Sequence, residues 1–99
     1  MQLVVCRVTL HLAENHSLKG KRHVVQALIA RLRSRFNVSV AEVDGYDLWQ
    51  TAVLGLALVA PDGAQAQRSM EQVVRFIEDA VRGDADVVDC QMEYTPGVL

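Results

Sequence analysis

Three cations crowd a position where an α-helix is expected to begin. The segment SLKGKR, which opens the predicted helix, contains Lys19, Lys21 and Arg22. The free N–H groups of a first helical turn already make that end positive, so each cation there costs a few tenths to about 1 kcal/mol. A bound phosphate would relieve this repulsion, because helix N-termini bind anions. The segment therefore predicts an anion site, to which His16 and His23 would add charge or hydrogen bonds.

An internal role for the same cations is the alternative. Gly20 leaves room for a ligand to approach the backbone, but Lys19 and Lys21 could instead pair with acids of this chain. The candidate partners on neighbouring strands and loops are Glu14, Glu42 and Asp44. GKR lacks the upstream glycine and the following Ser or Thr of a P-loop, so nucleotide hydrolysis is not indicated. Under the anion-site interpretation, replacing Lys19, Lys21 and Arg22 together weakens RNA binding and leaves the fold intact.

The charge is distributed unevenly along the 99 residues. The net charge is −2, yet the segment between Glu14 and Glu42 holds six of the ten Lys and Arg and no acid. Such asymmetry steers charged partners. The C-terminal arginines of the predicted helix suit its dipole, which is a sufficient structural explanation for them. Arg33 nevertheless falls on the same flank as Arg22, so an RNA backbone could follow Lys19, Lys21, Arg22 and Arg33 along one side.

Other chemistry gains little support from the sequence. The three histidines lie in different predicted elements, and no Cys or Ser nucleophile stands beside a base at a recognisable spacing. Acids around residues 42–47 are typical of a solvated hairpin loop rather than of a metal site. Cys6 and Cys90 form no CxxC pair and are interpreted as core packing, with a redox pair as the alternative. We expect no enzyme activity, no cofactor and no metal.

Apolar periodicity places these residues on six elements. Alternation predicts a strand over residues 3–12, with Cys6 on its apolar face, and another over 86–94, ended by Pro96-Gly97. Helical spacing predicts a helix from 18 to 36, with Ser17 as N-cap and Asn37 in the left-handed C-terminal position. After the break at residues 61–63, the apolar stripe from Met70 to Val81 predicts a second helix that ends near Gly83. Two β-rich runs, from residues 38 and 49, flank the short loop GYDL and predict a hairpin.

The order βαββαβ predicts an α+β, ferredoxin-like plait as a single domain over residues 1–99. Its four-stranded antiparallel sheet would have the order 4-1-3-2, with both helices on one face. The run from residue 49 is apolar on both sides, and one-sided helices cannot cover both. Such an open patch indicates an interface. We therefore expect a homodimer through the open sheet face, with unpartnered central-strand packing as the alternative.

The sequence resembles the YlxP family of small bacterial proteins. The resemblance lies in SLKGKRHVVQALIARLRSRFNVSVAEVD followed by DLWQTAVLGLALV. The family pattern contains SLK-x-KR, a helix ending in FNVSVAEV, and a D-x-W-Q motif before a long strand. The resemblance implies a ferredoxin-like fold and a gene near those for translation initiation and ribosome maturation. It implies no activity, since the family is a domain of unknown function.

These observations together predict a non-enzymatic module that binds RNA or a ribosomal subunit during ribosome assembly or translation. The predicted central strands carry no stacking aromatics, so the RNA would be read through its backbone, while Tyr46 and Trp49 could either pack or bind. The alternative is a dimeric regulatory or scaffolding module that binds a protein or a small anionic ligand. The N-terminal residues do not form a signal peptide and no run reaches membrane-spanning length, so we expect a cytoplasmic protein without membrane contact.

Overall fold

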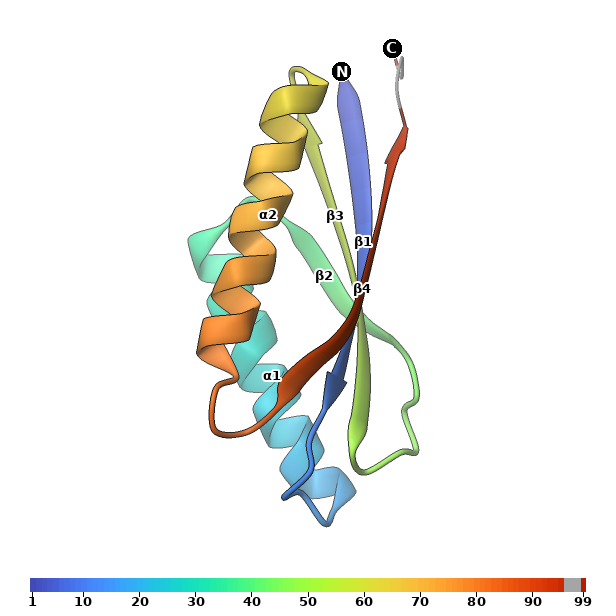
Figure 1. Ribbon diagram of the computed structural model, residues 1–99, viewed down its shortest axis with the longest axis vertical. Coiled ribbons are helices and arrows are strands. Elements are labelled where there is room, and N and C mark those ends of the chain that lie inside the picture. The colour runs from blue at the N-terminus through green and yellow to red at the C-terminus, as the bar shows by residue number, and fades with distance from the viewer. Residues whose placement is uncertain (96–98) are drawn as a thin grey trace.

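The computed structural model describes residues 1–95 and 99, and it has two layers (Figure 1). Its elements are β1 (Gln2–His11), α1 (Leu18–Arg35), β2 (Ser39–Asp44), β3 (Thr51–Ala60), α2 (Gly63–Ala80) and β4 (Asp86–Thr95). All neighbouring strands are antiparallel, in the order β2-β3-β1-β4. The predicted ferredoxin-like topology and strand order are therefore confirmed. The strand end expected at Pro96-Gly97 lies outside the described residues.

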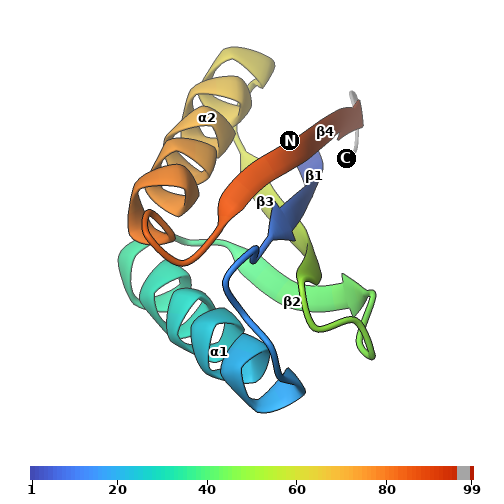
Figure 2. The same cartoon turned by 60° about the horizontal axis from the view of Figure 1, so that its bottom comes forward.

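The core lies between the helices and one face of the sheet. Both helices cover the same face (Figure 2), and the two central strands bury every second residue toward them. The alternation predicted for β1 is confirmed, because Val4, Val8 and Leu10 are buried while Val5 and His11 are exposed. From α1, Val25, Leu28 and Leu32 complete the core, whereas Val24 and Ile29 are only half-buried.

Helix α1 begins as predicted and ends differently. The Ser17 side chain caps it by accepting a hydrogen bond from the Gly20 N–H at 2.9 Å. At the other end Phe36 is extended, with φ −127° and ψ 150°, and Asn37 does not have a positive φ. The left-handed position expected at Asn37 is therefore wrong. The chain must enter β2 at Ser39, and an extended exit from the helix reaches that strand directly.

Helix α2 carries its predicted apolar stripe into the core. Asp62 caps it by accepting from the Gln65 N–H at 2.8 Å, and Met70, Val73 and Ile77 are buried. The helix ends at Ala80 rather than near residue 83. The turn that follows needs the positive φ of Gly83, 93°, which a glycine adopts without steric cost. No helix of the described chain is long and apolar enough to cross a membrane.

Strand β4 is much more exposed than its sequence predicts. Cys90 and Met92 face the helices as expected, since they pair with Val8 and Cys6 of β1. Cys90 is nevertheless exposed, whereas Cys6 is buried. The interpretation of both cysteines as core residues is therefore wrong for Cys90. β4 forms the edge of the sheet, and its pairing shifts register at a bulge beside Thr9 and Leu10, so helix α2 covers little of it.

Candidate nucleic-acid interface

Lys21 lies inside the protein, although the sequence predicts it in an anion site on the surface. Its side chain is only 1% exposed. The ammonium group donates to the backbone carbonyls of Gly45 at 2.8 Å, Thr51 at 3.1 Å and Tyr46 at 3.2 Å. Since an ammonium has three hydrogens, these carbonyls use all of its donors. Lys21 is therefore not available to an external anion, and that part of the prediction is wrong.

Glu42 supplies the charge that a buried ammonium requires. Its Oε2 lies 3.0 Å from the Lys21 Nζ, and the carboxylate is largely buried. The same oxygen has no hydrogen-bond donor among the described residues, so it acts on Lys21 through charge rather than through a directed hydrogen bond. The internal ion pair that the sequence offered as an alternative is thus present for Lys21. Taking either partner away would leave the other charge buried without compensation.

Hydrogen bonds join the β1–α1 loop to the β2–β3 loop. The Asn15 side chain donates to the Trp49 carbonyl at 2.6 Å and to the Ser17 carbonyl at 2.8 Å. Gln50 reaches back from the second loop and donates to the carbonyls of Ala13 at 3.0 Å and Asn15 at 3.2 Å. Ser17 and Gln50 of the SLKGKR and DLWQ segments thus serve the fold, as the buried lysine does. They fix the β2–β3 loop against the start of α1.

The space expected above Gly20 is already filled. A Cβ at this position would collide with the Asn15 side chain, so the carboxamide of Asn15 packs directly on the glycine. Gly20 therefore permits close packing within the chain, and the approach of a ligand predicted at this point is wrong. The N-terminus of α1 is occupied by the Asn15 and Ser17 side chains.

The other residues of the predicted site lie on the surface. Lys19, Arg22, His16 and His23 are exposed, and none of their side chains makes a hydrogen bond or ion pair with another described residue. Arg33 is also exposed, although its guanidinium donates to the Val40 carbonyl at 3.0 Å. The structure therefore divides the predicted cluster into one internal cation, Lys21, and several cations that face solvent.

The C-terminal half of α1 carries two more arginines that stack on aromatic rings. The guanidinium carbons of Arg31 and Arg35 lie 5.1 and 5.2 Å from the centre of the Phe76 ring. Phe76 itself meets Phe36 edge to face, with ring centres 5.5 Å apart. A stacked arginine keeps its edge free for hydrogen bonds, since the ring occupies only its face. Both guanidinium groups therefore remain able to contact an anion from solvent.

The β2–β3 loop displays three large apolar side chains. Tyr46, Leu48 and Trp49 are each more than half exposed, at 59%, 54% and 55%. Lys21 and Asn15 hold the backbone of this loop by donating to its carbonyl groups. The sequence left Tyr46 and Trp49 between packing and binding, and the structure shows that they do not pack in the core. An aromatic side chain held at the surface can stack on a base or insert into a protein pocket.

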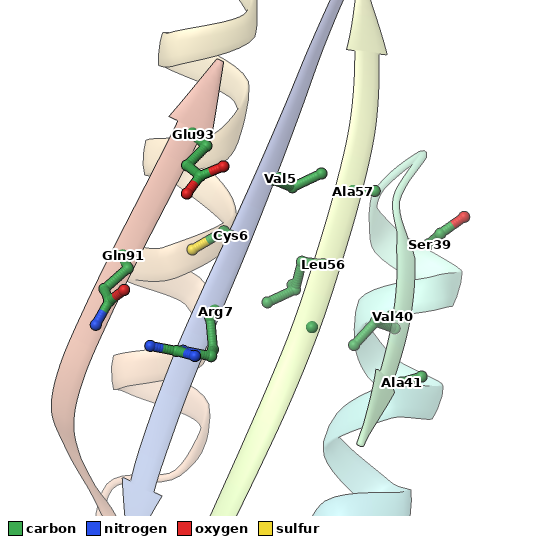
Figure 3. A pocket seen from close by; sticks show the side chains of 11 residues that line it. Val5, Cys6, Arg7, Ser39, Val40, Ala41, Leu56, Ala57, Gln91 and Glu93 are labelled. Carbon is green, nitrogen blue, oxygen red and sulfur yellow. The ribbon is translucent and has the colours of Figure 1, made fainter. Parts of the chain in front are cut away.

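The face of the sheet that lies away from the helices contains a hollow of about 480 Å³. Figure 3 shows Arg7, Gln91 and Glu93 on one side of it and small side chains on the other. The hollow is open on the side of β2 and β3 because the residues there are small: Ser39, Ala41, Gly55 and Ala57. Farther along the same face Val59 is 54% exposed. The open apolar face expected from the sequence is therefore present.

Comparisons with known proteins identify a family and a fold. The model of the family described as "Protein of unknown function (DUF503)" matches residues 3–92. "Uncharacterized protein YlxP" of Bacillus subtilis (strain 168) is 36% identical over 62 residues, which are 63% of this chain and 67% of that protein.

Solved structures share the fold at low identity. A chlorite dismutase-like protein has a TM-score of 0.66 at 7% identity, over 95% of this chain and 42% of that one. SnoaB, a cofactor-independent oxygenase from Streptomyces nogalater, has a TM-score of 0.57 at 9% identity, over 100% of this chain and 96% of that one. This chain thus spans less than half of the first of these proteins. At such identities the similarity concerns the fold alone.

Proposed function

We propose that this chain, which belongs to the DUF503 family of proteins of unknown function, is a non-enzymatic module that binds RNA through the exposed cations of α1. The resemblance to a family encoded near translation genes makes ribosomal RNA in the cytoplasm the first ligand to test. The similarity to oxygenase and dismutase folds supports no enzyme activity for this chain, because identity is 7–9%.

The observation that carries the proposal is the uncompensated charge of α1. This helix contains no acid, and all of its Lys and Arg except Lys21 are exposed: Lys19, Arg22, Arg31, Arg33 and Arg35. Within residues 1–95 none of these five forms a salt bridge, since the two salt bridges found there involve Lys21 and Arg82. A group of cations without internal ion pairs favours a polyanionic ligand.

The spacing of these cations suits a chain of phosphates better than a single one. Arg22 and Arg33 are eleven residues apart, which corresponds to three helical turns and about 16 Å along the helix axis. Lys19 lies one turn before Arg22 on the same flank. A ligand that reaches all three must therefore be extended, as a nucleic-acid backbone is.

The aromatic loop gives the same end of the molecule a second kind of contact. The backbone of Trp49 is joined to the start of α1 through Asn15, and the side chain of Trp49 is exposed. An unpaired base could stack on it, which is typical of RNA recognition. Glu14 and Asp47 are also exposed on these loops. Because these acids repel phosphates, they would keep the backbone of the RNA on the α1 side.

The experiment is a titration of purified ribosomal RNA and of ribosomal subunits with the full chain at several salt concentrations. We expect the logarithm of the association constant to fall linearly with the logarithm of the salt concentration. The slope should be about −0.7 to −0.9 for each phosphate contacted. At constant ionic strength, a small anion such as inorganic phosphate should not compete with the RNA for the protein. Absence of binding at low salt, or binding that does not respond to salt, would refute the proposal.

A second candidate function follows from the open sheet face, which fits a second copy of the chain. Arg7 and Glu93 both border the hollow, on adjacent strands, and they form no salt bridge with each other in the described chain. A two-fold axis that passes midway between Arg7 and Glu93 would bring the Arg7 of each copy to the Glu93 of the other, because an isologous interface pairs each patch with itself. The exposed Val5 and Val59 would be covered at the same time.

Sedimentation equilibrium tests this dimer. We expect a dimer for the natural chain and a monomer for Val59→Lys, since a buried unpaired ammonium is strongly disfavoured in an apolar interface. Val88→Lys is the matched control, because Val88 is similarly exposed, at 59%, but lies on the edge strand. A natural chain that stays monomeric up to high micromolar concentration would contradict the second candidate. Capture of a different protein by this face would contradict it as well.

A further inference from the structure

Two sulfur atoms meet where β4 joins β1. The Sγ atoms of Cys6 and Cys90 lie 3.6 Å apart, within hydrogen-bond distance for sulfur. Cys6 is opposite Met92, and Cys90 is opposite Val8, so the two cysteines occupy diagonal positions on adjacent strands with their side chains on one face. Diagonal neighbours of an antiparallel pair are close enough to interact. Formation of a disulfide would shorten this separation to the bonding distance of two sulfurs, about 2.0 Å.

The two thiols differ in access. Cys6 is buried in the core and Cys90 is exposed at the sheet edge. Burial, followed by the hydrogen bond and the charge of Cys90, raises the pKa of the Cys6 thiol to about 12. Cys6 is shielded from direct oxidation, because an oxidant in solution does not reach its buried side chain. Cys90 is the sulfur that an oxidant in solution reaches first.

We propose that Cys6 and Cys90 form an oxidisable dithiol that peroxide converts to a disulfide between β1 and β4. The Cys90 thiolate attacks one oxygen of hydrogen peroxide, the O–O bond breaks, and the departing hydroxide takes a proton and leaves as water. Cys90 is then a sulfenic acid. The sulfur of Cys6 attacks the Cys90 sulfur, the S–O bond breaks, and the hydroxyl leaves as water with the proton of Cys6. Two thiols are oxidised and one peroxide is reduced to two waters.

The surroundings favour this reaction over a structural zinc site. A zinc site needs four ligands, and no group of three His, Cys, Asp or Glu side chains converges anywhere in residues 1–95. A sulfenic acid with a thiol beside it condenses to a disulfide before further oxidation. Cys6 is thus placed as the resolving thiol. The new bond would fix the exposed edge strand to the centre of the sheet.

Intact-mass spectrometry of the full chain tests the assignment. The reduced protein is treated with hydrogen peroxide, unfolded, and alkylated with iodoacetamide before and after reduction. We expect the natural chain to lose both alkylation sites without adding oxygen to either cysteine, and to regain both sites after treatment with dithiothreitol. Peptide mapping should locate the bond between Cys6 and Cys90.

Two variants separate the roles of the sulfurs. Cys90→Ser should keep the Cys6 thiol unreacted under the same treatment, because this variant has no exposed thiol. Cys6→Ala should stop at a sulfenic acid on Cys90, which dimedone captures, and circular dichroism establishes that this variant is folded. If Cys6→Ala does not fold, Cys6→Ser gives the same measurement. A natural chain in which both thiols remain alkylatable, in which Cys90 proceeds to sulfinic acid, or in which disulfides form only between chains would overturn the proposal.

Discussion

The two edges of the sheet are held in opposite ways. At the β2 edge, α1 reaches the strand and its following loop with charged side chains, through Lys21 to Glu42 and through Arg33 to the Val40 carbonyl. At the β4 edge, no helix side chain makes a hydrogen bond to the strand within the described residues, and most of its side chains are exposed. The β2 edge is therefore tied to a helix by polar contacts, whereas the β4 edge is held by pairing with β1 and by the partly buried Val87 and Met92.

This difference shows where the cations of the chain are used. Lys21 serves the fold, whereas the side chains of Lys19 and Arg22, two and one residues away, make no hydrogen bond or salt bridge among the described residues. A basic motif in a sequence can thus combine structural and free cations. The free cations carry the functional proposal, and the structural one should be tested by stability.

The largest expected effect is that of Lys21→Met. The substitution keeps much of the volume but leaves Glu42 facing three carbonyls without a positive charge. Removing one partner of a buried pair costs about 3–5 kcal/mol of unfolding free energy. Urea denaturation measures this decrease in the free energy of unfolding. Lys19→Met is the matched control, which should stay within about 0.5 kcal/mol because Lys19 is exposed.

Equal destabilisation of the two variants would contradict the assignment of Lys21 as the structural cation.

The simultaneous replacement of Lys19, Lys21 and Arg22 by Ala tests the same assignment. The sequence alone predicts that this triple variant keeps its fold. The structure predicts that it is strongly destabilised, and that Lys19→Ala combined with Arg22→Ala is not.

Truncation of an apolar side chain to Ala compares the packing of α1 with that of the β4 edge through the free energy of unfolding. Leu28→Ala removes a core side chain of α1 that is 3% exposed, so we expect a decrease of about 2–5 kcal/mol in unfolding free energy. Met92→Ala should cost about 1 kcal/mol, since this residue of β4 is only half-buried and leaves a smaller cavity. Thermal and urea unfolding give both values. A larger decrease for Met92→Ala would mean that the β4 edge is the better packed one.

A further effect concerns the pH dependence of stability at the β1–β4 junction. The folded protein holds the Cys6 proton up to a pKa of about 12, against an ordinary value of 9.0. Folding therefore takes up a proton above pH 9, and this contribution to stability is full below pH 9 and disappears as pH rises toward 12. Urea unfolding of the reduced protein should show a steeper decline over this range than Cys6→Ala does. Parallel declines would mean that Cys6 titrates normally in the fold.

Much of the fold could be predicted from the sequence because the apolar periodicity is strong. The alternation in β1 and the stripe ending at Leu32 placed the core, and Ser17 identified the start of α1. The extended exit from α1 at Phe36 depends on where the chain must go next, and the exposure of Cys90 depends on which strand is the edge. Such features are tertiary, so local patterns do not contain them.

The candidate site was predicted less well, for a physical reason. The same SLKGKR pattern is consistent with cations that face solvent and with a cation that turns inward. Only the position of the β2–β3 loop, which brings the Gly45 and Thr51 carbonyls to Lys21, decides between them. A signal was nevertheless present, since Glu42 is an acid on the face of β2 that is otherwise apolar at Val40. An acid in such a position indicates a buried partner.

Charge reversal on α1 tests whether this helix is the RNA-binding surface. Lys19→Glu combined with Arg22→Glu should weaken binding to ribosomal RNA and reduce the salt slope by about one unit for each phosphate that the variant no longer neutralises. Arg68→Glu combined with Arg75→Glu is the matched control, because these arginines are exposed on α2 and the change in net charge is the same. We predict a clear decrease in affinity for the α1 variant and a small one for the α2 variant. Equal decreases in two folded variants would contradict the claim that α1 binds the RNA.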